Sequence, residues 1–444
     1  MKSKPQAKAG VKISPEALPD CVQAYYDPKS TIFWIPAKNN TWTRVNSIKP
    51  YLMLRCQVSA EQVSKFTLQV QEQHSLVYAG PLAGRRPGII STDKGLVLVT
   101  TSFRLTDPKP GKWRFIQRML EGRLGRQAQH LYVYLKLGYE ALRDGKMTPG
   151  LFLAFVGPPN MHKTCVQELI ITPILGGRTA EPWQFFTSAT EFNGDFLGAE
   201  HLIITDVDVK GNVKNTHIGS KVKQYCGTSD HRIHAKGRDA FQAEVFWRIT
   251  QSCNDSWPHI LALPDLADDT VRDKVLLLHF DGEEFGDWMP SERSQIQAKI
   301  ARELPCFINH LVKMKIPPQA LDKRFGQRAY QNRIAQEKYF NVTHEADLLE
   351  IIDEMLFSKG GLWRPAQPGD GWEGRAKELE SLLQMDRDCW QRCQRLGAIG
   401  QQLGKLLSGI AKNPATRQRV RVTTRANRSY YYIYPPPPPP NPHR

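Results

Sequence analysis

The chain has 444 residues, 41% of them hydrophobic, which is enough apolar sequence for more than one buried core. Lysine and arginine number 60 against 44 aspartate and glutamate, so the formal net charge is +16 and favours a polyanionic partner. The eight cysteines have no disulfide-like spacing and no run approaches the roughly 20 apolar residues that cross a bilayer, which argues against a disulfide scaffold and a membrane-spanning protein. Because residues 1–12 are basic and polar and do not resemble a signal peptide, we expect a cytoplasmic protein with no membrane partner.

The N-terminal quarter predicts a small accessory region. Residues 1–15 form a flexible basic leader, and 16–110 an α+β region in which aromatic residues alternate with polar turns. Its predicted elements are a β-meander from Val22 to about Leu54, a helix from Ala60 to Gln73, and strands around Gly95 to Phe103.

Between residues 111 and 285, apolar runs alternate with segments of helical spacing. This alternation is the signature of a parallel sheet with helices on both faces, so the predicted fold class is α/β. Residues Trp113–Leu142 predict one or two helices that lead into the sheet. The candidate strands are Leu151–Val156, His201–Thr205, Phe246–Gln251 and Lys274–Phe280.

The loop between the first of these strands and a predicted helix, Cys165–Leu175, nearly matches a phosphate-binding P-loop. In such a turn backbone N–H groups and the helix dipole bind phosphate oxygens, the lysine supplies charge, and the threonine hydroxyl ligates Mg²⁺. The sequence therefore predicts a site for a nucleoside triphosphate and Mg²⁺. The loop residues are Gly157, Pro158, Pro159, Asn160, Met161, His162, Lys163 and Thr164.

One position departs from the P-loop pattern, because His162 stands where glycine usually precedes the lysine. Glycine suits this tight turn since it has no side chain to crowd the phosphates. Histidine tolerates a positive φ better than most residues, so we expect the loop to close and the change to affect turnover more than fold.

Acidic residues on a neighbouring strand usually complete a P-loop site, and here Asp206 and Asp208 follow the run His201–Thr205. Asp206 is expected to hold Mg²⁺ through water, and Asp208 to act as the base or to share the metal. Such a pair also occurs in nucleotidyl-transferase sites and at ordinary solvent-facing strand ends. Its position after a P-loop favours the metal site.

Two further strand ends carry candidate chemistry. The strand that begins at Phe246 leads to Asn254, whose amide can hydrogen-bond the γ-phosphate or the attacking water. Arg272 and Lys274 precede the last strand, where a positive group could reach the γ-phosphate of a neighbouring subunit and stabilise transition-state charge. Arg272 is the preferred candidate of the two.

In this order the pieces resemble the superfamily 3 helicases of the AAA+ class, especially the helicase part of phage and poxvirus-type primase-helicases. The resemblance spans residues 81–332 and rests on the P-loop, the LIITDVD segment at 202–208, the asparagine motif Gln251–Asn254 and the strand Val271–Phe280. It implies an AAA+ core that hydrolyses ATP with Mg²⁺, forms a homo-oligomeric, hexameric ring, and moves along DNA. A phage-encoded protein of this kind would work in the cytoplasm of its bacterial host.

The resemblance also implies that a hairpin before the asparagine strand lines the pore of the ring and tracks single-stranded DNA. Residues 226–237 supply His231, Arg232, His234 and Lys236 on a turn-prone stretch, and a positive tip can follow a phosphate backbone without reading its sequence. Two alternatives stay open: a surface loop with incidental charge, and a zinc site formed by Cys226, His231 and His234.

The last 56 residues contain ten basic and no acidic residues, which points to nucleic acid first, an acidic membrane surface second, and a solvated tail third. Residues 286–343 read as a helical segment, and 344–434 as helices followed by an arginine-rich hairpin before a proline-rich tail, 435–444. The 344–434 segment resembles a winged-helix module, with 397–411 as its recognition helix. The arginines expected to contact phosphates of double-stranded DNA are Arg417, Arg419, Arg421, Arg425 and Arg428.

Cys389 and Cys393 lack a second cysteine pair, so we interpret them as small helix residues and not as metal ligands. The residues Gln367–Gly371 predict a linker.

The leading hypothesis is an ATP-dependent DNA helicase or translocase of the superfamily 3 type that acts in replication of a phage or other mobile element, beside a separate primase or other replication proteins. The first alternative is a nucleotide-gated replication initiator that binds an origin with little ATP turnover. The second is a fused primase-helicase, although the residues before the P-loop have no recognisable pair of catalytic acids and no zinc-ligand cluster.

Overall fold

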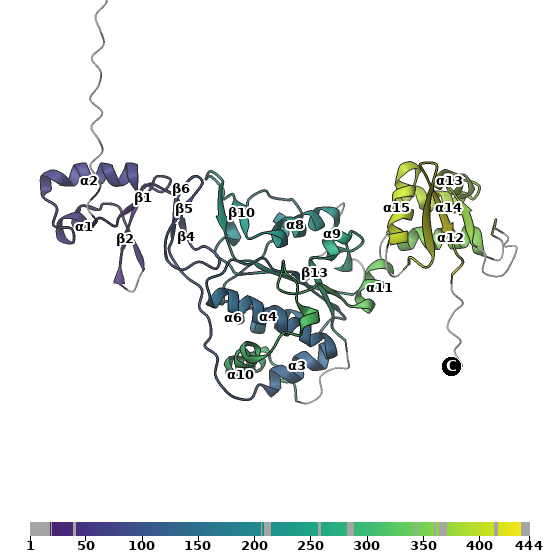
Figure 1. The fold of residues 1–444 in the computed structure, drawn as a ribbon, viewed down its shortest axis with the longest axis horizontal. Helices are drawn as coiled ribbons and strands as arrows, with labels where there is room; N and C mark the ends of the chain where they lie inside the picture. The colour runs from purple at the N-terminus through teal and green to yellow at the C-terminus, as the bar shows by residue number, and fades with distance from the viewer. Residues whose placement is uncertain are drawn as a thin grey trace, which may run out of the picture.

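A computed structural model describes residues 18, 20–38, 41–205, 207, 215–255, 259–281, 288–341, 344–358, 361–363, 371–412 and 416–436. Three lobes follow one another along this part of the chain: an N-terminal lobe, a central lobe built on a six-stranded sheet, and a C-terminal lobe (Figure 1). The outer lobes each have one cluster of buried apolar side chains, and the central sheet has a cluster on each face.

The N-terminal lobe is an antiparallel sheet of β1 (Tyr25–Asp27), β2 (Ile32–Pro36) and β3 (Trp42–Val45), with helices against one face. The predicted meander is present, but it ends at Val45. Helix α1 (Lys49–Leu54) follows instead of a further strand, because Pro50 favours the first turn of a helix. Helix α2 (Ala60–Gln73) has the predicted bounds.

A second small sheet joins this lobe to the central one. Its order is β4 (Leu76–Gly80), β6 (Gly95–Val99) and β5 (Gly88–Thr92), with β4 parallel and β5 antiparallel to β6. Only β6 was predicted, and it ends at Val99. The other two strands escaped prediction because few of their residues are fully buried, so their sequences lack a clear alternation.

The central sheet has six strands, each parallel to its neighbours, and confirms the predicted α/β fold class. Because side chains alternate along a strand, Phe152 and Val156 enter one apolar cluster while Phe155 enters the other. The sheet is therefore buried on both faces, as parallel sheets usually are. The strand order is β14 (Tyr330–Gln331), β13 (Val275–His279), β7 (Phe152–Gly157), β12 (Arg248–Asn254), β9 (His201–Thr205) and β8 (Thr179–Ala180).

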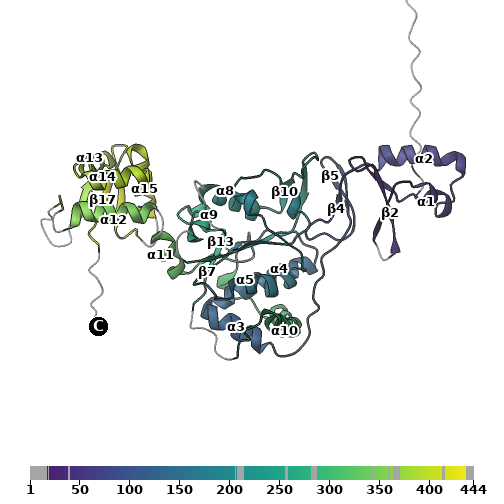
Figure 2. The ribbon, with the colours of Figure 1, turned by 180° about the vertical axis from the view of Figure 1, so that it is seen from behind.

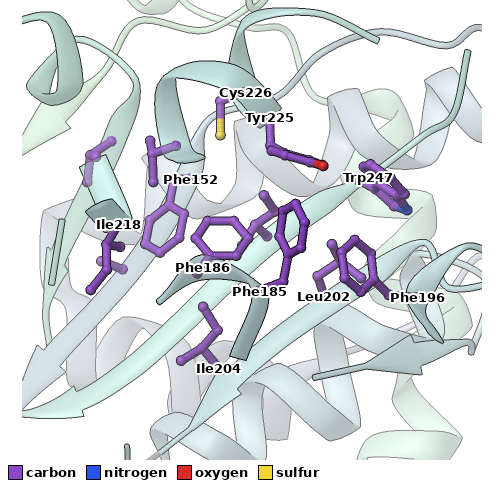
Figure 3. Close-up of a cluster of buried hydrophobic side chains, with 14 of the residues drawn as sticks. Phe152, Phe185, Phe186, Phe196, Leu202, Ile204, Ile218, Tyr225, Cys226 and Trp247 are labelled. Atoms are coloured by element: carbon purple, nitrogen blue, oxygen red, sulfur yellow. The ribbon is translucent and has the colours of Figure 1, made fainter. Parts of the chain in front are cut away.

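Helices cover both faces of this sheet (Figures 1 and 2). One face packs against α3 (Arg114–Leu124), α4 (Ala128–Arg143) and α10 (Arg293–Lys313). The other packs against α7 (Trp183–Phe186), α8 (Asn215–Gly227) and α9 (Asp269–Arg272). Figure 3 shows this second cluster, in which rings from α7 and α8 gather with Trp247 over the sheet.

The remaining elements of the central lobe are short. They are the hairpin β10 (Asp230–Ile233) and β11 (Phe241–Glu244), helix α11 (Arg333–Asn341), and the 3-10 helices η2 (Gly125–Gln127), η4 (Gly194–Phe196), η5 (His259–Ala262) and η6 (Pro318–Ala320).

The C-terminal lobe packs four helices on an antiparallel sheet. The helices are α12 (His344–Phe357), α13 (Ala376–Leu383), α14 (Arg387–Leu396) and α15 (Gly400–Lys412), and the strand order is β15 (Trp372–Gly374), β17 (Arg428–Ile433) and β16 (Val420–Arg425). The arginine-rich hairpin turns at Ala426 and Asn427, with φ of 48° and 58°, the geometry of a type I′ turn. Cys389 and Cys393 are buried in the apolar core of the lobe, which agrees with their interpretation as small helix residues.

Of the predicted linker, only Gly371 lies among the described residues. Within the described part of the chain, no helix has the length and apolar content needed to cross a bilayer.

Candidate nucleotide and DNA sites

The P-loop follows β7 at the carboxyl edge of the central sheet, and one helix of three segments follows the loop: α5 (Lys163–Val166), a π-helical turn η3 (Gln167–Ile171) and α6 (Thr172–Ile174). The first hydrogen bond within this helix runs from the Val166 N–H to the His162 carbonyl (3.0 Å). The N–H groups at the start of the helix therefore point out of its end, the arrangement that binds anions.

His162 caps this helix in the left-handed region, with φ 63° and ψ 22°. Asn160 also has a positive φ, 64°. The loop thus closes with histidine in the backbone conformation that glycine usually supplies, as predicted. Burial and the nearby Arg123 guanidinium lower the pKa of His162, so its ring is neutral at pH 7.

Lys163 is buried at the junction of strand and loop, with 5% of its surface exposed. Its Nζ donates to the carbonyl oxygens of Gly157 (2.9 Å) and Pro158 (2.6 Å) and to Oδ1 of Asn254 (3.2 Å). Asn254 reaches the lysine because β12 lies beside β7 with Asn254 opposite Gly157. The structure therefore brings together two of the predicted site residues.

Hydroxyl groups lie next to this contact. Thr164 Oγ1 is 3.4 Å from Ser252 Oγ on β12, and these oxygens are of the kind that Mg²⁺ prefers. Asp206 and Asp208 lie outside the described residues. Thr205, which precedes them on β9, pairs with Ser252, so β9 ends at the same edge of the sheet.

Strand β13 closes the other side of the P-loop strand. A Cβ at Gly157 would stand 2.3 Å from the Phe280 carbonyl oxygen, so only glycine allows this approach. The Gln127 amide holds the end of β13, accepting from the His279 N–H (2.9 Å) and donating to the His279 carbonyl (3.1 Å). Burial, and next the charge of Lys338, lower the pKa of the His279 ring.

Three charged residues beside the site were not singled out from the sequence. Asp255 follows Asn254 and forms an ion pair with Lys338 of α11. Arg123, at the end of α3, lies near His162. Asp255 could have been noted from its position after the asparagine, whereas no local pattern marks Lys338 or Arg123 because their places depend on the tertiary fold.

Arg272 and Lys274 lie before β13, at the amino edge of the sheet. The five residues of β13 span about 16 Å, which separates both side chains from the P-loop of the same chain. The Arg272 guanidinium pairs with Asp269 and donates to the Leu266 carbonyl (3.3 Å). Lys274 is only 6% exposed and donates to the Thr270 carbonyl (2.6 Å), so Arg272 is the more accessible of the two.

The predicted DNA-tracking hairpin is formed by β10 and β11. Arg232 and Lys236 are exposed, while His234 is half-buried with its ring 4.8 Å from that of Phe192. The Asn193 side chain is hydrogen-bonded to the backbone at the end of β10: it accepts from the His234 N–H (2.7 Å) and donates to the Arg232 carbonyl (2.8 Å). Asn193 therefore holds the backbone of the hairpin in place, and the hairpin exposes the cations of Arg232 and Lys236.

His231 does not join them, which corrects the expectation that it faces DNA. The residue is 4% exposed, and its ring lies between those of Tyr225 and Trp247, with each centroid 4.9 Å away. Burial lowers its pKa to about 4. Cys226 lies in the same apolar cluster (Figure 3), and no three potential metal ligands gather anywhere in the described part of the chain, so the geometry does not support the zinc alternative.

Arg238, in the turn of this hairpin, ties it to the N-terminal lobe. Its guanidinium donates to both Asp27 carboxylate oxygens (3.2 and 2.9 Å) and to the Val77 carbonyl (3.3 Å). Burial would raise the pKa of Asp27, but hydrogen bonds from Arg238 and Ser30 outweigh it and hold that pKa below its usual value. Sequence reasoning missed this pair, whose members are 211 positions apart.

The arginines of the C-terminal hairpin fall into two groups. Arg417, Arg421, Arg425 and Arg428 are exposed. Arg419 instead pairs with Asp353 of α12 and donates from Nε to the Tyr434 carbonyl (3.0 Å), so its guanidinium holds the hairpin within the lobe.

Helix α15, the expected recognition helix, faces the central lobe. Its residues Gly404, Lys405 and Ser408 line a cavity of about 530 Å³ together with Asp265 and Asp268. In this arrangement the helix meets acidic side chains of the central lobe across the cavity.

Solved structures similar to this chain include helicases. The apo structure of the NrS-1 C terminal region (305–718) matches 92% of this chain and 95% of its own, with 11% identity and a TM-score of 0.49. The SCCmec type IV Cch active helicase matches 93% of this chain and 92% of its own, with 9% identity and a TM-score of 0.37. The JCV helicase matches 45% of this chain and 52% of its own, with 12% identity and a TM-score of 0.29. No family model and no curated protein sequence matches the chain. The likeness concerns the fold alone.

Proposed function

We propose that this chain is an ATP-hydrolysing DNA translocase of the superfamily 3 type, working as a hexameric ring in the replication of a phage or other mobile element, in the cytoplasm of its host. The observation that carries the proposal is the contact of Lys163 with Asn254 at the carboxyl edge of the sheet. Thr164 lies at the same edge, and β9 ends there. Loop and strand ends from separate parts of the sequence thereby supply a cation, a hydroxyl and an amide to one place, the groups that phosphoryl transfer uses.

Each residue has its own part in this reaction. Lys163 and the N–H groups at the start of its helix bind the β- and γ-phosphates, and the ammonium exchanges loop carbonyls for phosphate oxygens. Asn254 orients the γ-phosphate or the attacking water, and Asp208 accepts the proton of that water. Thr164 and Asp206 would hold Mg²⁺, which when bound neutralises charge on the phosphate oxygens.

The position of Arg272 supports assembly into a ring. It lies a full strand length from the P-loop of its own chain, so it can stabilise charge only on a nucleotide bound by a neighbouring subunit. Lys274 is the weaker candidate because it is buried and already hydrogen-bonded to Thr270 and Asp273.

Two basic surfaces support DNA as the track. Arg232, His234 and Lys236 on the clasped hairpin would engage single-stranded DNA in the pore. The helices of the 344–434 lobe and its arginine-rich hairpin, β16 and β17, support a winged-helix module as the second surface, whose exposed arginines, Arg417, Arg421, Arg425 and Arg428, would contact phosphates of double-stranded DNA.

Steady-state ATP hydrolysis with and without single-stranded DNA tests this function. We expect turnover that DNA stimulates, and a loss on the order of 100-fold or more in a Lys163→Ala variant, since the cation at the transferring phosphate is removed. The matched control is Lys146→Ala, an exposed lysine before β7 at the opposite edge of the sheet. ATP hydrolysis that survives Lys163→Ala contradicts the site, and ATP binding without any turnover contradicts the motor.

A further inference from the structure

We propose that the outer face of the N-terminal sheet is a second binding site for single-stranded DNA, next to the tracking hairpin. The outer face is defined here by Tyr25, Trp34, Trp42 and Arg44. The choice of partner rests on the proposed DNA translocase, but the residues are outside the nucleotide site and its strands.

The strand register gathers these side chains on one side of the sheet. Tyr25 lies opposite Trp34 and Trp34 opposite Arg44, so the three form a row across β1, β2 and β3. Trp42 is two residues from Arg44 on β3 and therefore points to the same side. Phe33 points to the other side, where the apolar cluster with α2 lies, so the lobe's own core does not use the outer face. Arg44 is exposed, and the three aromatic residues are half-buried.

The rings are held in place before any ligand binds. Tyr25 stacks on His74 with centroids 5.0 Å apart, and meets Trp42 edge-on at 5.6 Å. The His74 ring is fixed in turn by a 2.8 Å hydrogen bond between Nδ1 and the Ala24 carbonyl. Rigid rings lose little entropy on contact with a base, and every base can stack on them, so such a platform binds single strands of any sequence.

Charge on the outer face suits a phosphate backbone. The Arg44 guanidinium lies 5.5 Å from the Trp34 ring centroid, so one cation and one stacking ring are presented together. Lys29 and Lys38 are exposed on the turns beside the same strands. Aromatic rings interleaved with cations are the combination by which proteins hold single strands, and this favours nucleic acid over an apolar protein partner.

The outer face is also joined to the tracking hairpin. Asp27 is two residues from Tyr25 on β1, at the end of the outer face, and its carboxylate binds Arg238 in the hairpin turn. Lys236 lies two residues before Arg238 in the same turn. A strand that contacts Lys236 can therefore continue onto the outer face.

The test is equilibrium binding of a fluorescein-labelled oligothymidylate to the full chain without nucleotide, compared across four variants. We expect Trp34→Leu, which keeps an apolar side chain but no stacking ring, to weaken binding on the order of tenfold, and Trp34→Phe to keep most of it. Arg44→Gln should weaken binding and reduce the slope of log affinity against log salt by about 0.7, the value for one phosphate contact on a single strand. Leu68→Ala, an exposed apolar position on α2 of the same lobe, should bind as the wild type does.

The outcomes separate this site from the motor. If Trp34→Leu and Arg44→Gln both bind like Leu68→Ala, the inference is wrong, whatever the ATPase activity. If Trp34→Leu and Arg44→Gln weaken DNA binding while the wild type hydrolyses no ATP, the proposed binding site on the outer face is supported and the proposed motor is wrong. Thermal unfolding of each variant identifies a misfolded lobe, and in that case Arg44→Gln, at an exposed position, decides the result alone.

Discussion

Replacing Arg238 by methionine tests whether charge holds the N-terminal lobe to the hairpin of β10 and β11. Asp27, which is 3% exposed, accepts two hydrogen bonds from Arg238 and others from Ser30 Oγ (2.9 Å) and the Lys29 N–H (3.1 Å). Methionine keeps much of the side-chain volume but leaves the buried carboxylate without its cation. Breaking a buried pair costs about 3–5 kcal/mol, and because the Arg238 side chain is 21% exposed we expect a loss of about 3 kcal/mol at pH 7.

The pH dependence gives this prediction a distinctive sign. In the wild type the pKa of Asp27 lies below its unfolded value, so the contribution of the carboxylate is present at neutral pH and is lost as the pH falls through the folded pKa. In Arg238→Met the hydrogen bonds and the charge that lower the pKa of Asp27 most are gone, so this pKa is higher than in the wild type. The variant's carboxylate is therefore protonated first as the pH falls, and the difference in stability from the wild type should shrink on acidification.

Hydrogen exchange of the β1 amides, together with calorimetric unfolding at pH 7, 5.5 and 4, measures both effects in the full chain. The matched control is Arg85→Met, which breaks a surface pair with Glu244 whose side chains are 27% and 58% exposed and should cost at most about 1 kcal/mol. A variant that unfolds like this control at pH 7, or one whose deficit relative to the wild type grows on acidification, would refute the reasoning.

Three other changes test the nucleotide site and the hairpin. Asn254→Ala should lower kcat for ATP hydrolysis about 100-fold with little change in ATP affinity, as measured by steady-state kinetics and equilibrium binding, because the amide acts mainly on the transition state. His162→Gly should raise kcat while changing the free energy of unfolding by no more than about 1 kcal/mol, since glycine adopts the left-handed conformation without a side chain beside the phosphates. In the wild type, the free energy of unfolding should fall by up to about 3 kcal/mol between pH 6.5 and 4, because the folded His231 ring has a pKa of about 4 and stays neutral while the unfolded chain takes up a proton. His231→Phe has no such group, so its unfolding free energy should not show this fall.

Features that depend on a short stretch of sequence could be predicted, and those that depend on contacts between residues far apart in the sequence could not. The P-loop strand, the left-handed His162 and the bounds of α2 follow from local patterns and are present in the structure. The ion pairs Asp27 with Arg238 and Asp255 with Lys338 join residues 211 and 83 positions apart, and neither has a local signal.

For His231, the local sequence suggests an exposed residue, whereas the structure buries it. Its neighbours are polar and turn-forming, which suggests an exposed loop. The structure has a strand there, and its alternation of exposed and buried residues turns His231 inward with Ile233 and leaves Arg232 outside. A strand prediction for 230–233 would have assigned one face to the core and the other to solvent.

The connection between Asn254 and the hairpin constrains how ATP could move DNA. Strand β12 ends at Asn254 and begins one residue after Trp247, whose ring packs on His231 of the hairpin. Because β12 is hydrogen-bonded to β7 on one side and β9 on the other, it cannot slide without breaking two ladders. A displacement of β12 at Asn254 therefore displaces the neighbouring strands as well, and the Trp247 ring and the Arg238 pair connect this sheet to the hairpin and the N-terminal lobe. In the proposed translocase this favours rigid-body rotation of subunits against one another, driven where Arg272 would meet the nucleotide of a neighbouring subunit, over a hairpin that swings within a fixed subunit.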